Sequence, residues 1–157
     1  MRAPVTAYIA LGGNLGDPGV TLVQAMDDLA AIIGVTLISR SSLYRTAPVG
    51  SSGPDYVNAV VEILTILTAP ALLTQLQQLE QMAGRKRPYR NAPRTLDLDV
   101  LTYGDACVDS AALIIPHPRM TERAFVLLPL AEIAPRRVRA DQLLAVSGQA
   151  ITRMTDF

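Results

Sequence analysis

Hydrophobic and polar residues alternate along this chain with two different periods, which predict strands and helices in turn. Four segments have the short apolar or alternating pattern of strands: 6–11, 35–44, 56–67 and 95–103. In 17–34 and 68–84 apolar residues return every three or four positions, with a proline near the start and a glycine at the end, as in helices. Gly12 and Gly13 mark the end of the first strand, and the glycine-rich stretch 12–16 predicts a tight turn into the first helix.

The order strand, helix, strand, strand, helix, strand predicts an α+β sandwich of the ferredoxin-like type, with an antiparallel sheet and the helices packed mainly on one face. Farther along, a helical turn is expected from Thr121 and an interruption at Pro129. The tail is weakly patterned, with one short helix from Asp141. We expect one domain over residues 1–157, with a core from about residue 5 to about residue 135 and a tail over 136–157.

The composition is that of a folded, globular chain, since half of the 157 residues are hydrophobic and 18% are charged. Basic and acidic residues balance at 14 each, so no net charge attracts the protein to nucleic acid or to an anionic membrane. Cys107 is the only cysteine, which excludes an intrachain disulfide and a multi-cysteine metal site. Because the sequence shows neither a signal-peptide pattern nor an apolar run that could span a bilayer, we expect a soluble cytoplasmic protein.

Two carboxylates alternate with apolar residues in the last predicted strand. Alternate residues of a strand share a face, so Asp97 and Asp99 should point to the same side, with their Cα atoms roughly 6.5–7 Å apart. One or two carboxylates, completed by phosphate and water oxygens, form the coordination that Mg²⁺ prefers. A solvent-facing strand with two solubilising acids would show the same pattern.

Five basic residues stand within the ten positions just before this strand: Arg85, Lys86, Arg87, Arg90 and Arg94. Two prolines disfavour regular structure in 85–93, and guanidinium groups bind phosphate oxygens bidentately, so we expect this segment to close over a bound polyphosphate. A solvated loop or an RNA-binding patch is the alternative, although Tyr89 is the only aromatic residue there. Cations for phosphate beside carboxylates for Mg²⁺ indicate nucleotide-dependent phosphoryl transfer.

Two further features carry less information. His117 is the only histidine and lies between two prolines. A lone histidine is more often structural than catalytic, and no neighbouring cysteine or histidine completes a transition-metal site, which leaves a hydrogen bond to phosphate as its functional alternative. The glycine-rich stretch 12–16 lacks both the Rossmann and the Walker spacing and does not indicate ATP binding.

Six segments resemble, in their order along the chain, the 6-hydroxymethyl-7,8-dihydropterin pyrophosphokinase family. They are 7–16 (AYIALGGNLG), 44–48 (YRTAP), 54–59 (PDYVNA), 93–99 (PRTLDLD), 115–120 (IPHPRM) and 123–125 (RAF). The resemblance implies the ferredoxin-like fold and transfer of the β,γ-diphosphate of ATP to the pterin hydroxymethyl oxygen, with release of AMP, in folate biosynthesis. It also implies two Mg²⁺ ions, with ATP as co-substrate. We expect a monomer whose partners are these substrates and neither nucleic acid nor a membrane.

The resemblance implies roles for individual residues. Asp97 and Asp99 would hold the two magnesium ions, and Arg85 and Arg94 would clamp the polyphosphate. The implied pterin-binding residues are Thr46, Pro48, Val49, Tyr56, Asn58 and Phe125. Among them the Asn58 amide would read the pterin edge, and two aromatic rings would stack on the pterin. The implied ATP-binding residues are Gln77, Glu80, Arg87, Arg94, Val100, Ile114, His117 and Arg123. The positions of Gln77 and Glu80 fit an exposed helix face equally well.

Some positions depart from the family pattern. The arginine segment is one residue shorter, Asn91 stands where many members carry a tryptophan, Pro118 stands where a tyrosine often follows the histidine, and Ala47 replaces a proline. These departures bear on loop closure and ATP affinity rather than on the reaction class.

Two other functions are compatible with the same residues. One is that of another Mg²⁺-dependent phospho- or nucleotidyltransferase on this fold. The other is that of a non-catalytic RNA-binding module, which needs aromatic residues on the face of its sheet, whereas this chain is only 4% aromatic.

Overall fold

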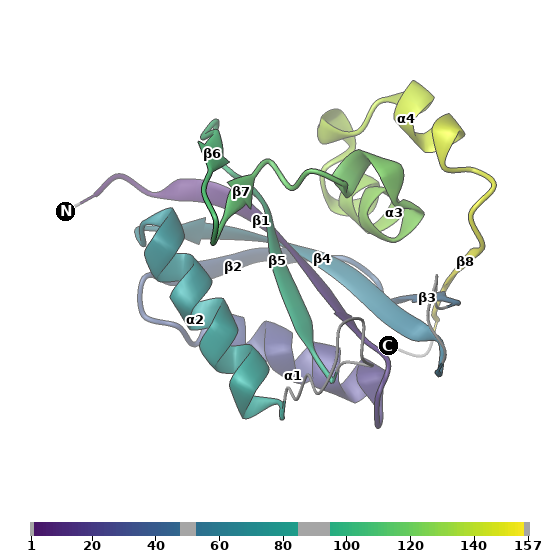
Figure 1. Ribbon diagram of the computed structural model, residues 1–157, viewed down its shortest axis with the longest axis horizontal. Helices are drawn as coiled ribbons and strands as arrows, with labels where there is room; N and C mark the ends of the chain where they lie inside the picture. Colours follow the sequence, from purple (N-terminus) through teal and green to yellow (C-terminus); the bar gives the residue numbers. More distant parts are fainter. Residues whose placement is uncertain (1, 48–52, 85–94, 156–157) are drawn as a thin grey trace.

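The computed structural model describes residues 2–47, 53–84 and 95–155. Its elements are, in chain order, β1 (Val5–Gly13), α1 (Pro18–Ala30), β2 (Val35–Arg40), β3 (Tyr44–Thr46), β4 (Tyr56–Thr65), α2 (Ala69–Met82), β5 (Asp97–Tyr103), β6 (Val108–Asp109), β7 (Ile114–Ile115), α3 (Ala124–Ile133), α4 (Ala140–Ala145) and β8 (Ile151–Arg153). Short 3₁₀ turns at Met120–Glu122 and Pro135–Arg137 flank α3. The two predicted helices and the predicted antiparallel sheet are confirmed (Figure 1).

The main sheet has the strand order β5-β1-β4-β3-β8, and β2 pairs with β4 along the same edge as β3. Every pairing in it is antiparallel. The prediction of one strand over 35–44 was wrong, because the ladder breaks between β2 and β3. At the break the Ser41 hydroxyl accepts a hydrogen bond from the Val60 N–H at 2.9 Å, so a side chain replaces a backbone carbonyl as the acceptor.

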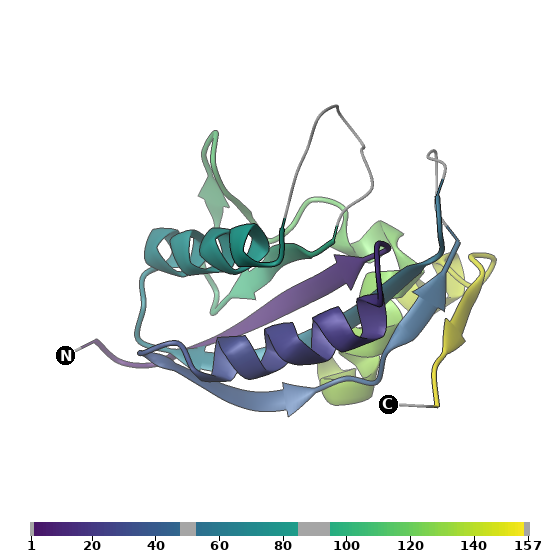
Figure 2. The same ribbon diagram turned by 90° about the horizontal axis from the view of Figure 1, so that it is seen from below.

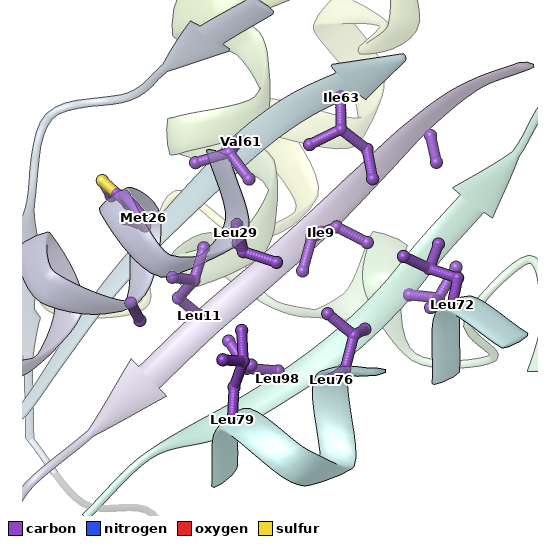
Figure 3. Packing of buried hydrophobic residues seen from close by; sticks show 14 of the residues in the cluster. Ile9, Leu11, Met26, Leu29, Val61, Ile63, Leu72, Leu76, Leu79 and Leu98 are labelled. Atoms are coloured by element: carbon purple, nitrogen blue, oxygen red, sulfur yellow. The ribbon is translucent and has the colours of Figure 1, made fainter. Parts of the chain in front are cut away.

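Helices cover both faces of the sheet (Figures 1 and 2). On one face the apolar stripes of α1 and α2 pack against the inward residues of β1, β4 and β5, as the sequence predicts for these two helices. Figure 3 shows this core, in which Leu29 of α1 and Leu76 of α2 approach Ile9 of β1. On the opposite face α3 packs its Leu127 and Leu130 against a second cluster of buried residues.

The helix boundaries follow from local chemistry. Asp17 and Thr68 cap α1 and α2, since their side chains accept hydrogen bonds from the N–H groups of Val20 and Ala71. The predicted interruption at Pro129 was wrong, because α3 continues through this residue to Ile133. Pro129 is buried within α3, so the packing of this helix outweighs the one helical hydrogen bond that a proline cannot donate. No helix within 2–47, 53–84 and 95–155 is long and apolar enough to cross a membrane.

The strand end expected at Gly12 and Gly13 was wrong, because β1 continues through both glycines. The predicted turn into α1 is present within 12–16, where the chain bends at Leu15 and Gly16. Gly12 pairs with Asn58 of β4 on one side and with Asp97 of β5 on the other. The two glycines therefore belong to an inner strand of the sheet, between the two strands that carry the candidate chemistry.

Candidate active site

Candidate residues from three neighbouring strands form one row across the sheet. Gly12 stands in the middle, with Asp97 and Asn58 directly opposite it on either side. Leu11 and Leu98, which neighbour Gly12 and Asp97 in their strands, point into the core under α1 and α2. Because side chains alternate between the faces of a strand, the row faces the other side of the sheet. At the usual spacing of strands, the backbones of Asp97 and Asn58 lie about 10 Å apart. A ligand of moderate size can therefore reach both side chains at once.

Asn58 is held from two sides. It is only 5% exposed, and its amide nitrogen donates a hydrogen bond of 3.0 Å to the Thr46 hydroxyl of β3. A Cβ atom placed on Gly12 would lie 2.9 Å from the Asn58 amide oxygen, so only glycine leaves room for this amide. An amide carries two N–H donors and an oxygen acceptor, so one N–H and the oxygen can pair with the edge of a heterocycle.

Asp97 and Asp99 are half-buried, and the residue between them, Leu98, is buried under the helices. The two carboxylates thus lie on the same face of β5, as their spacing predicts. Within the described ranges, no three residues of the types His, Cys, Asp and Glu gather as a metal-binding group. Two hard oxygen donors suit Mg²⁺, which commonly takes its remaining ligands from phosphate and water.

Glu80 of α2 lies behind these carboxylates. It is 3% exposed, and its carboxylate accepts a hydrogen bond of 2.8 Å from the N–H of Leu98, the residue between Asp97 and Asp99. Glu80 therefore joins α2 to the part of β5 that carries both aspartates. Gln77, one turn earlier, is exposed. The exposed-face interpretation thus fits Gln77 and does not fit Glu80.

Removing the Glu80 carboxylate tests this connection between α2 and β5. Glu80→Ala is expected to lower the free energy of unfolding by about 1–3 kcal/mol, because the buried Leu98 N–H loses its acceptor. Gln77→Ala, on the exposed side of the same helix, should change it by no more than about 0.5 kcal/mol. Urea unfolding of both variants under identical conditions gives the comparison. If Glu80→Ala were as stable as Gln77→Ala, the role given to Glu80 would be contradicted.

His117 lies near the carboxylate end of the row. Its backbone N–H donates to the Leu101 carbonyl, and its Nδ1 accepts from the Arg119 N–H at 3.2 Å. Burial lowers the pKa of His117, Arg123 and Arg119 lower it further, and the Asp97 carboxylate opposes them. The imidazole is therefore neutral at neutral pH, and since Nδ1 is an acceptor, Nε2–H is the donor left for a ligand.

The other predicted residues lie in several places. Tyr56 is half-buried at the start of β4 and pairs with Thr46, while the Arg123 guanidinium carbon lies 5.3 Å from the centre of the Phe125 ring. The Val100 side chain is buried in the core under α1 and α2, so only its backbone can meet a ligand on the other face. Ile114 is exposed in β7. The predictions for five residues lie outside the described residues: Pro48, Val49, Arg85, Arg87 and Arg94.

A match to a known protein family includes every residue of this candidate site. The model of the 7,8-dihydro-6-hydroxymethylpterin-pyrophosphokinase (HPPK) family matches residues 8–135. The chain belongs to the HPPK family. The resemblance drawn from the six sequence segments is thereby confirmed.

Several HPPK relatives are similar over most of the chain, and each is named 2-amino-4-hydroxy-6-hydroxymethyldihydropteridine pyrophosphokinase. The Haemophilus influenzae protein is 42% identical over 151 residues, 96% of this chain and 91% of the relative. The Bacillus subtilis protein is 48% identical over 128 residues, 81% of this chain and 77% of the relative. The Synechocystis protein is 46% identical over 129 residues, and the match covers 82% of this chain but 66% of that longer relative.

Solved HPPK-DHPS structures share the fold. One, described as HPPK-DHPS in complex with substrates, superposes with a TM-score of 0.67 over 85% of this chain and 40% of its own, at 14% identity. A Plasmodium falciparum HPPK-DHPS triple mutant gives a TM-score of 0.68 over 86% of this chain and 40% of its own, also at 14% identity. The chain spans less than half of either, and at this identity the likeness shows the fold alone.

Sequence reasoning missed one residue of this candidate site, Gly12, and the hydrogen bond that Glu80 accepts from the Leu98 N–H. The sequence contains a signal for Gly12, since a glycine in a strand interior often marks a close approach. It cannot show which residue approaches, because the pairing of Gly12 with Asn58 joins strands that are far apart in the chain.

Proposed function

We propose that this protein transfers the diphosphate group of ATP to the hydroxymethyl group of 6-hydroxymethyl-7,8-dihydropterin, giving AMP and the pterin diphosphate in folate biosynthesis. The observation that carries this proposal is the row across the sheet, in which Asp97 lies two strands away from the held Asn58 amide, with Asp99 on the same face of β5 as Asp97. These residues lie within the stretch that matches the HPPK family, whose name states the same activity.

The pterin half of the site would centre on Asn58. Its amide can pair with the ring edge, and Tyr56 and Phe125 would supply the faces on which the ring stacks. Asn58 is buried and its amide already bonded to Thr46, so little ordering would accompany binding. Pro48 and Val49 are proposed as further backbone contacts to the pterin.

The phosphate half would centre on Asp97 and Asp99, which would hold two Mg²⁺ ions. When bound, these ions neutralise the charge of the phosphate oxygens. Arg85 and Arg94 would clamp the polyphosphate, and the neutral His117 would donate from Nε2 to a phosphate oxygen. The other proposed nucleotide contacts are Gln77, Glu80, Arg87, Val100, Ile114 and Arg123.

The reaction needs little covalent chemistry from the protein. The hydroxymethyl oxygen forms a bond to the β-phosphorus of ATP, the bond from that phosphorus to the bridging oxygen of AMP breaks, and the hydroxyl proton is released. Orientation and charge neutralisation are the contributions expected in phosphoryl transfer of this kind. The row would supply both, because a pterin at Asn58 and the phosphates at Asp97 would then lie side by side.

We further infer a ferredoxin-like arrangement for the core, supported by the strand order β5-β1-β4-β2 and by α1 and α2 on one face. We propose that residues 1–157 form one pyrophosphokinase domain. The protein would act as a cytoplasmic monomer on these two small substrates, without a nucleic-acid or membrane partner.

Incubation with ATP, Mg²⁺ and the reduced hydroxymethylpterin tests the proposed reaction. We expect AMP and the pterin diphosphate to form in equal amounts, and no AMP without the pterin. ADP in place of AMP would indicate an ordinary kinase. If neither nucleotide is formed while the protein binds RNA, the enzymatic proposal is wrong.

A further inference from the structure

The row that carries Asp97, Gly12 and Asn58 continues outward through two more strands. Asn58 pairs with Tyr44 of β3, and Tyr44 pairs with Arg153 of β8. β8 belongs to the tail, beyond residue 135, where the match to the HPPK family ends. The tail therefore supplies the edge strand of the sheet at the end of the row nearer to Asn58.

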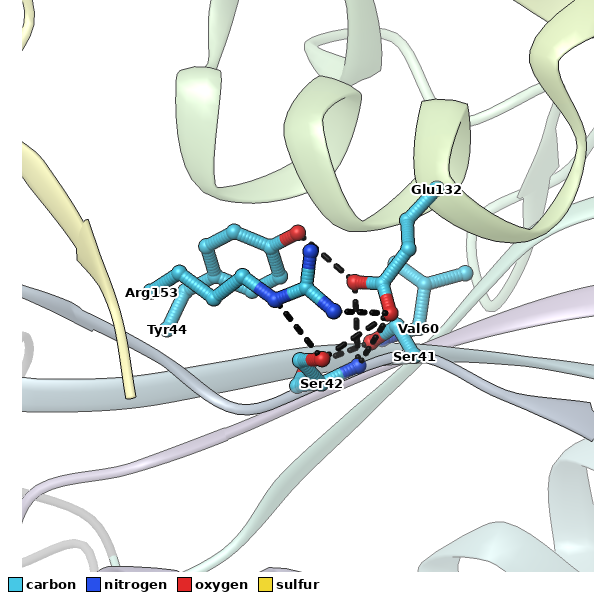
Figure 4. Close-up of polar contacts among 6 residues, drawn as sticks. All are labelled: Ser41, Ser42, Tyr44, Val60, Glu132 and Arg153. Carbon is cyan, nitrogen blue, oxygen red and sulfur yellow. Dashed lines mark hydrogen bonds and ion pairs between the residues drawn. The ribbon is translucent and has the colours of Figure 1, made fainter. Parts of the chain in front are cut away.

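Glu132, near the end of α3, joins this edge of the sheet to the helix above it (Figure 4). Its carboxylate accepts hydrogen bonds from the Tyr44 hydroxyl at 2.7 Å, from the Ser42 N–H at 3.0 Å and from the Ser42 hydroxyl at 2.9 Å. An Arg153 Nη2 donates to the same carboxylate at 3.3 Å, and the Arg153 Nε donates to the Ser42 hydroxyl at 3.0 Å. One carboxylate thus connects α3, β3, β8 and the segment between β2 and β3.

The charges fit this arrangement. Burial and the hydrogen bond to Glu132 raise the pKa of Tyr44 above its usual range, so the phenol remains a donor. Burial alone would raise the pKa of Glu132, but the hydrogen bonds from Tyr44 and Ser42, together with the charge of Arg153, outweigh it and lower the pKa. The carboxylate is therefore ionised at neutral pH, and its hydrogen bonds are charge-assisted.

β3 needs such an anchor because it has only three residues. A ladder this short contributes few hydrogen bonds. Yet β3 carries Thr46, whose hydroxyl receives the Asn58 amide N–H. Whatever holds β3 against β4 therefore also fixes the orientation of the Asn58 amide.

We propose that Glu132, acting with Tyr44 and Arg153, is a positioning residue for the heterocycle-binding half of the site. Its carboxylate holds β3 in place, Thr46 then holds Asn58, and the Asn58 amide is oriented before a ligand arrives. The tail strand β8 takes part because Arg153 completes the cluster. The predicted effect on pterin affinity rests on the proposed function of Asn58, whereas the effect on the Asn58 amide itself does not.

Binding measurements on conservative variants test the effect on affinity. Glu132→Gln and Tyr44→Phe should each weaken pterin binding roughly 5- to 20-fold, because part of the binding free energy is then spent on ordering β3. The affinity for an ATP analogue should stay within about twofold of wild type, since the phosphate half lies on β5. Arg139→Ala is the matched control, because it breaks an exposed ion pair with Asp141 in the same tail. Unchanged pterin affinity in both folded variants, or equal weakening for both ligands, would overturn the proposal.

A second readout does not depend on the pterin. In the ligand-free protein, the ¹H–¹⁵N signal of the Asn58 side-chain amide, assigned by its loss in Asn58→Ala, should move toward the position of a solvated amide in Glu132→Gln. It should stay in place in Arg139→Ala. An Asn58 signal that does not respond to Glu132→Gln would refute the positioning role whether or not pterin binds. If the signal responds but wild-type protein binds no pterin, the positioning role stands and the proposed substrate is wrong.

Discussion

Replacing Asp97 or Asp99 by asparagine is expected to lower kcat/KM by about three orders of magnitude, or about 4 kcal/mol of transition-state stabilisation. Asparagine keeps the size of the side chain but loses the negative charge that attracts Mg²⁺. Both carboxylates lie on one face of β5, half-buried, with Leu98 between them packed in the core. The substitutions therefore change the charge of the site and leave the packing of the strand intact.

The matched control is Asp105→Asn, in the exposed turn that follows the same strand, which should retain wild-type activity. Steady-state kinetics at saturating Mg²⁺, with circular dichroism to verify folding, measure the difference. If the folded double variant of Asp97 and Asp99 turned over at the wild-type rate, the assignment of the phosphate half would be wrong.

Gly12→Ala is expected to weaken pterin binding by roughly 1–3 kcal/mol, which is about 5- to 150-fold. The added methyl group would lie 2.9 Å from the Asn58 amide oxygen, so the amide must move and its hydrogen bond to Thr46 is strained or lost. ATP binding should change little. Gly148→Ala is the control, because a Cβ there meets no atom within 4 Å.

A double-mutant cycle makes this prediction specific to the amide. Asn58→Ala alone should weaken pterin binding by a similar amount, and adding Gly12→Ala to it should have little further effect, since the group that clashes is gone. Calorimetric titration with pterin and with an ATP analogue gives all four corners of the cycle. Fully additive losses would mean that Gly12 acts on something other than Asn58.

The elements whose pattern is local were predictable from the sequence. Each of the helices α1 and α2 has its apolar period and its capping residue, Asp17 or Thr68, within one short stretch of sequence. The structure has both helices at these places. The shared face of Asp97 and Asp99 follows in the same way from the period of a strand. Each of these features depends on neighbours in the sequence.

The features that the sequence did not predict depend on partners far along the chain. Gly12 resembles a turn residue until β4 and β5 are placed on either side of it. The break between β2 and β3 depends on the Ser41 hydroxyl, which meets an N–H group 19 residues away. Glu132 contacts Ser42 across 90 residues, and no local pattern marks either one. Local propensity also failed at Pro129, which is buried inside α3 without ending the helix.

The central claim is that the metal at Asp97 and the heterocycle at Asn58 bind to the same row of the sheet, on strands separated only by β1. Paramagnetic Mn²⁺, added in place of Mg²⁺ with a non-hydrolysable ATP analogue, tests it directly through the NMR signal of the Asn58 side-chain amide. Because the backbones of Asp97 and Asn58 are about 10 Å apart, this signal should broaden strongly in the wild-type protein. It should stay sharp in the Asp97→Asn, Asp99→Asn double variant. A sharp Asn58 signal in the wild-type protein, while other signals broaden around bound Mn²⁺, would show that the metal lies elsewhere and contradict the account.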